Sequence, residues 1–364
     1  MGRAPVSVGT VRLASLIRAA RDRGASDLHF GGSDRPGLRV DGRLIALETA
    51  PIDDAAIRMF LSAALSGAQL ARLYADGTAD GAAPAAADGA PYRLHAYRHG
   101  GGLRVAIRLL AERVPSLEEL ALPAAVASFA ERPSGLALFT GPTGSGKTTA
   151  LASLIDRINR TADRNIVTVE DPVEYVHAPL RSFVTHCEVG RDVADFAEAL
   201  RGFMRADPDV VLVGEMRDRA TMEAALTAAE TGHLVFATLH TNDAAQTVDR
   251  IVDAFPPDAH TQVRVQLASV LAGIAALRLV PRRDGGGRCA AAEILIGTDA
   301  VRALIREGKT HQLRNTIVTG RAAGMQTLES HLSELVVRGE VHHKDAQAVT
   351  IRAAEVRGFE RAAS

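Results

Sequence analysis

The stretch that most limits how this chain can fold lies between residues 141 and 148. It consists of Gly141, Pro142, Thr143, Gly144, Ser145, Gly146, Lys147 and Thr148. The pattern G-x-x-x-x-G-K-[ST] is typical of a loop that binds the phosphate groups of a nucleotide. Its glycines let the backbone curl so that N–H groups point at phosphate oxygens. Lys147 supplies positive charge for the terminal phosphates, and the hydroxyl of Thr148 is a ligand for Mg²⁺.

The sequence on both sides suits such a loop. Leu136–Phe139 is a short apolar run typical of a buried parallel strand. From Thr148 to Asn159, leucines and isoleucines recur at helical spacing, which predicts a helix whose N-terminus faces the phosphates. A glycine-rich turn can match the pattern by chance, but the flanking strand and helix favour a site for ATP and Mg²⁺. Thr149, the next helical residue, belongs to the same predicted nucleotide site.

Length and composition exclude several classes of protein. A chain of 364 residues suggests two or three domains. Its 42 Lys and Arg balance 43 Asp and Glu, which argues against a nucleic-acid grip over the whole surface. The two cysteines, Cys187 and Cys289, are too far apart in sequence for a CxxC zinc site. Without a signal peptide or an apolar run of membrane-spanning length, we expect a cytoplasmic protein with no direct membrane insertion.

Residues 1–112 predict a small α+β domain. A helix is expected at 11–23, and Asp41-Gly42-Arg43 between short apolar runs is typical of a tight hairpin turn. Residues 91–99 and 103–110 alternate as two further strands. Ala75–Ala90, rich in Ala, Gly and Asp, predicts a flexible surface insertion. The proline-containing stretch 113–132 predicts a linker.

Residues 133–364 predict an α/β domain with a mainly parallel sheet, because strand and helix patterns alternate along them. The predicted strands are Leu136–Thr140, Ile166–Glu170, Val210–Gly214, Leu234–Thr238 and Glu293–Ile296. Beyond Thr241 the pattern becomes helical, and one long helix is predicted over Ala259–Leu279. The last part of the chain is therefore expected to be a helical extension.

An apolar run, Val210–Gly214, ends in the carboxylate of Glu215. A buried parallel strand would bring that carboxylate beside the phosphate loop, where it can polarise the attacking water or hold Mg²⁺ through water. Gly214 stands where an Asp facing Mg²⁺ is common, so a second acid is expected to help. A Glu that only caps a helix would give the same local pattern.

A second acidic stretch follows another predicted strand. Val167–Glu174 contains Glu170, Asp171 and Glu174. Several carboxylates beside an anionic ligand repel each other unless a cation neutralises them. Glu170 is therefore the first candidate for holding Mg²⁺ or its water, and Glu174 is the second. An acidic turn without a metal is the alternative.

Two histidines frame the strand predicted at Leu234–Thr238. Polar residues at the carboxyl end of a buried strand face the ligand crevice in open α/β sheets. His240 is therefore expected to sense the terminal phosphate. His233, at the opposite end, either reaches a neighbouring subunit or packs structurally.

These four stretches together resemble the secretion-ATPase superfamily of type IV pilus and type II secretion motors. The phosphate loop, the acidic stretch, Gly214-Glu215 and the two histidines each match one of its motifs, and Gly-Glu is the family's own pattern. Ala25–His29 is similar to the signature of its N-terminal PAS-like domain. The resemblance implies a PAS-like domain followed by a RecA-like P-loop ATPase domain with C-terminal helices.

Within the superfamily, the chain looks most like the retraction ATPases of type IV pili, the PilT/PilU family. Residues 300–312 and 324–328 resemble the C-terminal signature of that family. The resemblance implies a homohexamer that hydrolyses ATP to power pilus retraction and twitching motility. It also implies a peripheral location at the inner-membrane pilus base, where the partners are the platform protein and, as a further candidate, a paralogous motor ATPase.

Motors of this family need arginines from the N-terminal domain near the nucleotide. Arg93 matches the first such position, Arg108 the second, and Arg104 is a weaker candidate. Each has an alternative as a solvated arginine on a strand face. Two departures from the family pattern stand out: the Ala/Gly-rich residues 77–90, and Ala276-Leu277 in place of the usual Ser-Gln.

Three other functions stay open at this point. An assembly or secretion ATPase is disfavoured, because such motors are longer at the N-terminus and usually carry a four-cysteine zinc element. A weakly active or accessory paralogue, riding on another motor, fits the two departures. A nucleic-acid translocase shares the P-loop core, but the sequence has no obvious basic or aromatic binding element, so we expect no nucleic-acid partner.

Overall fold

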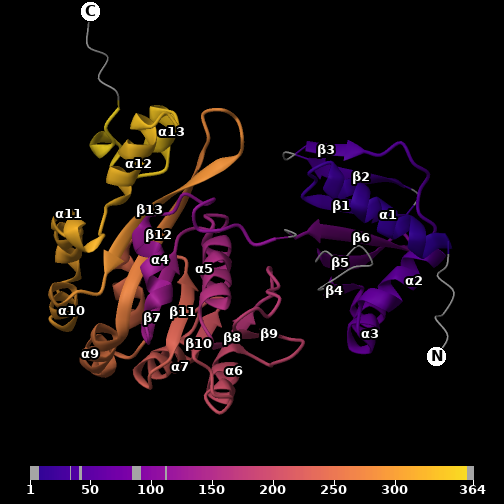
Figure 1. The fold of residues 1–364 in the computed structure, drawn as a ribbon. Helices are drawn as coiled ribbons and strands as arrows, with labels where there is room; N and C mark the ends of the chain where they lie inside the picture. The colour runs from indigo at the N-terminus through magenta and orange to yellow at the C-terminus, as the bar shows by residue number, and fades with distance from the viewer. Residues whose placement is uncertain (1–7, 33, 41–42, 84–91, 111–112, 359–364) are drawn as a thin grey trace, which may run out of the picture. The chain divides into compact units, whose positions relative to one another are not determined.

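The computed structural model describes residues 8–32, 34–40, 43–83, 92–110 and 113–358. Their contacts divide the chain into two compact units. The first comprises Met1–Arg113 together with Glu174–Val176, and the second comprises Val114–Val173 and His177–Ser364. Figure 1 labels the helices and strands of both units.

The first unit is built on a six-stranded antiparallel sheet with the order β3-β2-β1-β6-β5-β4. Its elements are α1 (Val8–Asp22), β1 (Asp27–Gly31), β2 (Asp34–Val40), β3 (Arg43–Ala46), α2 (Asp54–Ala64), α3 (Gly67–Asp76), β4 (Thr78–Ala83), β5 (Tyr92–His99) and β6 (Gly102–Leu109). Along β5 and β6 buried residues alternate with more exposed ones. One face of the sheet therefore packs on the helices, around a core that includes Leu28, Ile57 and Ile107.

The flexible insertion predicted over Ala75–Ala90 is wrong for its first half. Thr78–Ala83 form β4, which pairs with β5 along its whole length. Gly77, at φ 83°, ends α3 and lets the chain turn directly into this strand. Small residues hide the strand in the sequence, because they show no apolar alternation. Residues 84–90, and the hairpin turn predicted at 41–42, lie outside the described residues.

The second unit is built on a seven-stranded sheet with the order β13-β12-β7-β11-β10-β8-β9. Its elements are α4 (Ala124–Ala127), η1 (Ser128–Glu131), β7 (Gly135–Thr140), α5 (Lys147–Thr161), β8 (Asn165–Glu170), β9 (Phe183–Glu188), α6 (Phe196–Phe203), β10 (Val210–Val213), α7 (Arg219–Glu230), β11 (Leu234–Leu239), α8 (Ala244–Asp253), η2 (Pro257–Ala259), α9 (His260–Val270), β12 (Leu271–Pro281), β13 (Arg288–Ile296), α10 (Asp299–Arg306), η3 (Thr310–Gln312), α11 (Leu313–Thr319), η4 (Arg321–Ala323), α12 (Leu328–Val337), α13 (His343–Ala348) and η5 (Ala353–Glu355). Every neighbouring pair is parallel except β12 and β13. The mainly parallel α/β sheet predicted from the sequence is therefore present.

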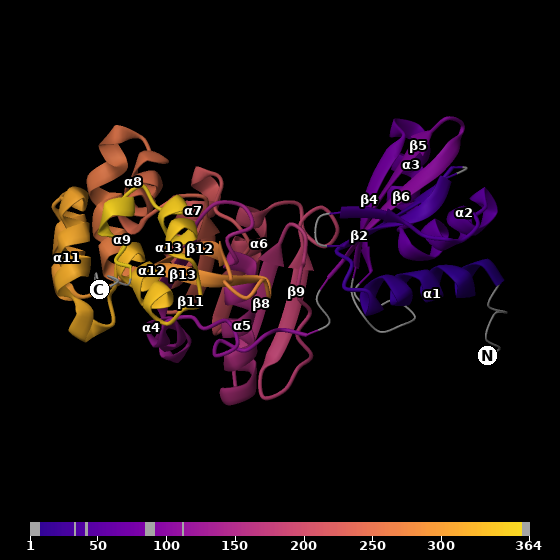
Figure 2. The ribbon, with the colours of Figure 1, turned by 90° about the horizontal axis from the view of Figure 1, so that it is seen from above.

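Helices cover both faces of this sheet, as the view from above shows (Figure 2). Successive side chains of a strand point to opposite faces. Along β7, Leu136 and Leu138 join the core formed with α7, α8 and α9, whereas Ala137 and Phe139 join the core formed with α5. Because both faces are buried, the central strands read as continuous apolar runs.

The single helix predicted over Ala259–Leu279 is also wrong. The helix α9 stops at Val270, and the chain continues as β12, the strand that pairs with β7 on one side and β13 on the other. A short buried apolar run cannot be assigned to helix or strand by periodicity alone. Gly273 lies where other groups approach the strand closely. An added Cβ there would lie 2.5 Å from the ring of Phe129 and 2.6 Å from the carbonyl oxygen of Leu295 in β13.

The edge strand β9 was not predicted either. Its residues alternate only weakly between exposed and half-buried positions, and Phe183 is 78% exposed. An edge strand packs on one neighbour, so its composition is less apolar than that of a central strand. Two of its side chains, His186 and Glu188, lie beside the acidic stretch.

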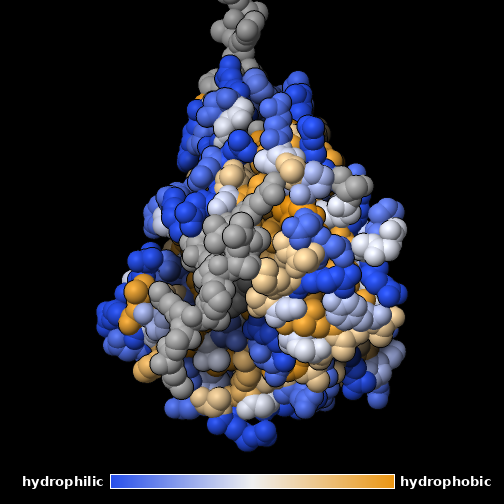
Figure 3. Space-filling model, turned by 90° about the vertical axis from the view of Figure 1, so that its right-hand side faces the viewer, coloured by the Kyte–Doolittle hydropathy of each residue, from blue (hydrophilic) through white to orange (hydrophobic). Residues whose placement is uncertain are grey.

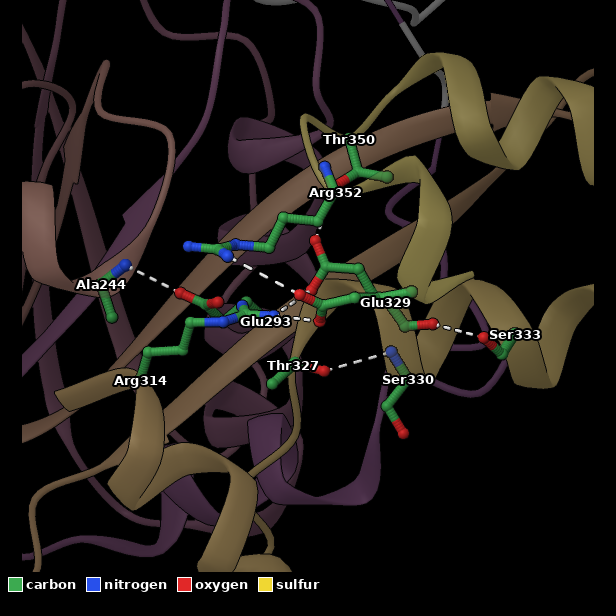
Figure 4. A network of polar contacts seen from close by, with 10 residues as sticks. Ala244, Glu293, Arg314, Thr327, Glu329, Ser330, Ser333, Thr350 and Arg352 are labelled. Atoms are coloured by element: carbon green, nitrogen blue, oxygen red, sulfur yellow. Dashed lines mark hydrogen bonds and ion pairs between the residues drawn. The ribbon is translucent and has the colours of Figure 1, made fainter. Parts of the chain in front are cut away.

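A polar network fixes the C-terminal helices (Figure 4). Glu329 of α12 is buried and accepts hydrogen bonds from Nη2 of Arg314 at 3.2 Å and from the hydroxyl of Thr350 at 2.6 Å. Arg314 also pairs with Glu355. Removing one partner of a buried pair leaves the other charge uncompensated, so these contacts hold Thr350 and Glu355 against α12.

In the part of the chain that the structure describes, no helix has the length and apolar character needed to span a membrane.

On the face drawn in Figure 3, hydrophobic side chains reach the surface at several places among hydrophilic ones. Leu44 and Ile45 of the edge strand β3 are 62% and 50% exposed. Exposed edge strands of this kind are available for contact with another chain.

Candidate nucleotide-binding site

The glycine-rich loop joins the end of β7 to the start of α5, as the sequence predicted. Gly141, Gly144 and Gly146 have φ values of 140°, 76° and 93°, which only glycine adopts without strain. Space also requires a glycine at position 141, because an added Cβ would lie 2.5 Å from the carbonyl oxygen of Leu277. The loop therefore curls tightly at the N-terminus of α5, where anions are favoured.

Lys147 is buried against this loop. Its Nζ donates hydrogen bonds to the carbonyl oxygens of Gly141 at 2.7 Å and Pro142 at 3.1 Å. Burial lowers the pKa of Lys147, the charge of Glu215 acts in the opposite direction, and Arg278 adds to the lowering. Glu215 and Arg278 therefore lie close enough to act on the lysine electrostatically.

Two buried hydroxyl groups fit a phosphate ligand. Oγ1 of Thr140 and Oγ of Ser145 have no hydrogen-bond partner among the described residues. Buried hydroxyls without partners are rare, and each is a donor for an oxyanion. Pro142, Thr143 and Gly144 are exposed, so the outer side of the loop is accessible to a ligand.

Glu215 follows the end of β10 and is tied to two cationic or potentially cationic groups. Its Oε1 lies 3.0 Å from Nε2 of His240, and its Oε2 accepts a hydrogen bond from Nε of Arg217 at 2.8 Å. His240 follows the end of β11, the strand next to β10. The structure thus brings together Glu215, which the sequence assigned to the attacking water or Mg²⁺, and His240, which it assigned to the terminal phosphate.

The packing of β10 against β8 explains the glycine at position 214. A Cβ added to Gly214 would lie 3.1 Å from Cα of Glu170 and 3.2 Å from the carbonyl oxygen of Val169. The carbonyl oxygen of Gly214 also accepts a hydrogen bond from the hydroxyl of Thr238 at 2.5 Å. A side chain at position 214 would require the β8 backbone to move by a few tenths of an ångström, and the same close approach sets Glu170 beside Gly214.

Glu170 ends β8 and is buried, with 7% of its surface exposed. Oε1 of its carboxylate lies 3.9 Å from Nδ1 of His186 in β9. Since β7, β8, β10 and β11 are parallel, their carboxyl ends meet at one edge of the sheet. Glu170, Glu215, His240 and the phosphate loop all lie at that edge.

His233 lies at the other end of β11, and its ring has hydrogen-bond partners nearby in the chain. Its Nδ1 is 2.9 Å from the carbonyl oxygen of Ala228 and 3.2 Å from the hydroxyl of Thr231. These partners belong to the C-terminal end of α7. Of the two roles that the sequence left open for His233, this geometry fits structural packing.

The candidate arginines lie within the sheet of the first unit, and each has a carboxylate partner. Arg104 pairs with Asp34. Nη2 of Arg93 lies 3.0 Å from Oε1 of Glu174, and Nε of Arg108 donates to Oδ1 of Asp27 at 2.9 Å. Burial raises the pKa of Asp27, but hydrogen bonds from Ser26 and Arg108 outweigh that effect and lower it overall.

Sequence reasoning missed Arg278. It lies on β12, where Nη2 donates to the side-chain oxygen of Asn242 at 2.8 Å and Nη1 to the carbonyl oxygen of Leu277 at 2.9 Å. Leu277 in turn abuts Gly141. The only signal in the sequence was a single charge inside the apolar run Leu267–Val280, which a predicted helix left without a role.

Comparison with known proteins decides the family. The model of the type II/IV secretion system protein family matches residues 11–362. The chain belongs to the type II/IV secretion system protein family. This member is 40% identical over 337 residues to the type IV pilus retractation ATPase PilT of Pseudomonas aeruginosa, a match covering 92% of this chain and 97% of that relative.

Two further similarities agree with this assignment. The chain is 48% identical over 250 residues to a twitching motility protein of Neisseria gonorrhoeae, covering 69% of this chain and 67% of the relative. The crystal structure of the pilus retraction motor PilT with bound ADP is similar at a TM-score of 0.87 and 39% identity, covering 96% of this chain and 99% of that one. The resemblance to PilT/PilU-type secretion ATPases is confirmed, as is the mixed α/β fold with an N-terminal domain and an ATPase domain.

Proposed function

We propose that this protein is an ATP-hydrolysing hexameric motor that powers type IV pilus retraction. The carboxyl edge of the parallel sheet carries the proposal, because the curled phosphate loop and the Glu215–His240 pair lie together there. Similarity to a pilus retraction ATPase over nearly the whole chain supports the same function.

The residues at this edge divide the task between binding and chemistry. We assign nucleotide binding to Gly141, Pro142, Thr143, Gly144, Ser145, Gly146, Lys147, Thr148 and Thr149. Glu215 is positioned to accept the proton of the attacking water, with His240 and Arg217 orienting its two oxygens. His240 can also sense the terminal phosphate.

Thr148 and Glu170 are the residues that would hold Mg²⁺. The ion supplies neutralising charge between the phosphates when it is bound. Among the described residues, no three His, Cys, Asp or Glu side chains are grouped to hold a metal. A few protein ligands completed by phosphate oxygens and water are the usual environment of Mg²⁺ in nucleotide sites.

We also propose that residues 1–112 form a PAS-like domain, 113–132 a linker and 133–364 a RecA-like ATPase domain with C-terminal helices. Arg93 and Arg108 are the residues of the first domain that would add positive charge to the transferring phosphoryl group, with Arg104 as a weaker candidate. Glu174 is the weaker candidate, after Glu170, for holding Mg²⁺ or its water. Each arginine would have to exchange its present carboxylate partner for the nucleotide.

A closed homohexamer follows from such composite sites, because only a ring satisfies every head-to-tail contact. The exposed apolar residues of β3 support contact between chains. We expect the ring to lie on the cytoplasmic side of the inner membrane at the pilus base, against the platform protein and with a paralogous motor as a further partner.

Two measurements on the whole protein test this function. The purified protein should hydrolyse ATP as a six-chain ring, and a cell without it should extend pili but not retract them. The accessory paralogue would be identified instead if the purified ring binds ATP without turnover and pili still retract in a cell that lacks the protein. A persistent monomer with full activity would contradict the composite sites.

A further inference from the structure

Two side chains of the edge strand β9 lie on the same face of the sheet as Glu170. In the parallel pairing of β8 with β9, Thr168 is opposite His186 and Glu170 is opposite Glu188. Alternate residues of a strand share a face, so these four side chains form one row. All are buried or nearly so, since His186 and Glu170 expose only 13% and 9% of their side chains.

The hydrogen bonds of His186 settle where its ring proton lies. Nε2 is 3.0 Å from the backbone nitrogen of His177, whose N–H can only donate. Nε2 must therefore be the acceptor, and the proton is on Nδ1. Nδ1 lies 2.9 Å from the hydroxyl oxygen of Thr168 and 3.9 Å from Oε1 of Glu170.

The ring of His186 is also held in its plane. It stacks on the ring of His177 with a centroid distance of 5.6 Å and an interplanar angle of 19°. His177 is itself buried. The imidazole consequently has one orientation, with the protonated edge toward Thr168 and Glu170 and the other edge toward the loop that follows β8.

The second side chain of β9 fixes the same loop at its other end. Oε2 of Glu188 accepts a hydrogen bond from the backbone N–H of Val173 at 3.2 Å, and both groups are buried. Val173 and His177 are the last and first residues of the second unit on either side of Glu174–Val176, which group with the first unit. The loop is thus anchored at the two points where the chain leaves and re-enters the second unit.

We propose that His186, with Glu188 beside it, is a positioning residue for Glu170. Its Nε2 holds the loop that begins at Asp171. Its protonated Nδ1 faces Thr168 and Glu170. The carboxylate of Glu170 therefore keeps its orientation when Glu174–Val176 are displaced. This inference rests on the role proposed above for Glu170 in holding Mg²⁺.

The isosteres of histidine separate the contacts. Gln places an amide oxygen about where Nε2 lies, so His186→Gln keeps the acceptor for the His177 N–H. His186→Leu removes it, and His186→Asn is polar but too short to reach that N–H. A backbone donor buried without a partner is strongly unfavourable, so the loop should shift in the Leu and Asn variants.

ATP turnover of the full chain in the presence of Mg²⁺ tests the proposal. We expect kcat of His186→Leu and His186→Asn to fall about tenfold, equivalent to about 1.4 kcal/mol. KM for ATP should stay within about twofold of the wild type, since the phosphate loop is untouched, and His186→Gln should recover kcat to within about threefold. His342→Leu, at an exposed histidine that directly precedes α13, is the matched control and should behave like the wild type.

Two outcomes would overturn the positioning role. One is a kcat within twofold of the wild type in a folded Leu or Asn variant, and the other is a Gln variant as impaired as these two. Glu170→Gln, measured in parallel, separates this failure from a failure of the proposed function. If Glu170→Gln turns over ATP normally, the role of Glu170 is wrong; if it is inactive while His186→Leu is normal, only the positioning role is wrong.

Discussion

The two sheets of this protein place charged residues differently. The central strands of the second sheet are buried on both faces, and their acidic residues stand where strands end, as Glu170 and Glu215 do. The first sheet is buried on one face only, and its arginines lie within strands, at Arg93, Arg104 and Arg108. A charge buried inside a doubly covered strand is costly, so an acidic residue at the end of such a strand is a signal of function. In a half-exposed sheet an arginine has a solvent face, so its position indicates little.

The largest expected effect on ATP turnover comes from a substitution in the phosphate loop of the doubly covered sheet. Lys147→Ala should abolish ATP turnover and weaken nucleotide binding, because the terminal phosphates lose the cation of the loop. Lys309→Ala, which removes an exposed lysine paired with Glu307, is the matched control and should leave turnover unchanged. Turnover at the wild-type rate in Lys147→Ala, measured by phosphate release, would contradict the whole motor function.

The next effect tests which acidic strand end provides the base. Glu215→Gln should lower turnover by about 10³- to 10⁴-fold while ATP binding persists, because the amide fills the same space but cannot accept a proton. Single-turnover hydrolysis and equilibrium binding of ATP measure the two properties separately. Normal hydrolysis in Glu215→Gln together with inactivity of Glu170→Gln would show that the base is Glu170.

The third prediction tests whether arginines of the half-exposed first sheet contribute to ATP turnover. If Arg93 and Arg108 reach the nucleotide, Arg93→Ala and Arg108→Ala should each lower turnover by about 10³-fold with ATP affinity largely kept. Arg98→Ala, on the exposed part of β5, is the control and should change little. Each variant must first be shown to form the ring by light scattering. Rates within about twofold of the wild type would mean that these arginines only occupy a solvated strand face.

The smallest expected effect is on stability. Glu293 in β13 is buried and accepts a hydrogen bond from the backbone N–H of Ala244, and burial raises its pKa to about 7 from the ordinary value of 4.5. The unfolded chain therefore releases this proton more easily, and the free energy of unfolding should fall as the pH rises from about 4.5 to about 7.

Glu293→Gln removes this proton release while keeping an acceptor for Ala244. The difference in free energy of unfolding between the variant and the wild type should increase by up to about 3 kcal/mol from pH 5 to pH 8. A shift of one pKa unit corresponds to about 1.4 kcal/mol. Denaturant unfolding at both pH values measures the difference. Glu307→Gln, at an exposed carboxylate, should show no such gain with pH. An equal offset at both pH values would mean that Glu293 titrates normally in the folded protein.

The sequence predicted where the residues of the candidate site lie better than it predicted the strands around them. The loop at Gly141–Thr148 was found because its chemistry is local: a strand, a turn with glycines and a helix follow one another in the chain. Glu215 and His240 were found because each directly follows an apolar run. Position relative to a buried strand was enough to bring them to one edge of the sheet.

The parts that sequence reasoning missed depend on pairing between distant strands. The sequence predicts a helix where β12 lies, because its partner β7 is far away in sequence and an apolar run alone does not show that it pairs. β9 lies at an edge, where half-exposed residues leave no clear pattern, so neither His186 nor Glu188 drew attention. The reason for Gly214 is likewise a distance to Glu170, which no local pattern contains.

The grouping of Glu174–Val176 with the first unit has a consequence for how the protein is made. Synthesis on the ribosome proceeds from the N-terminus, and domains generally fold as units in that order. Here the first unit stays incomplete until β7, α5 and β8 of the second have been synthesised, because Glu174 follows all three. A nascent chain released after Arg113 lacks the carboxylate that Arg93 binds. Completion of the N-terminal unit therefore requires that the phosphate loop has been translated first.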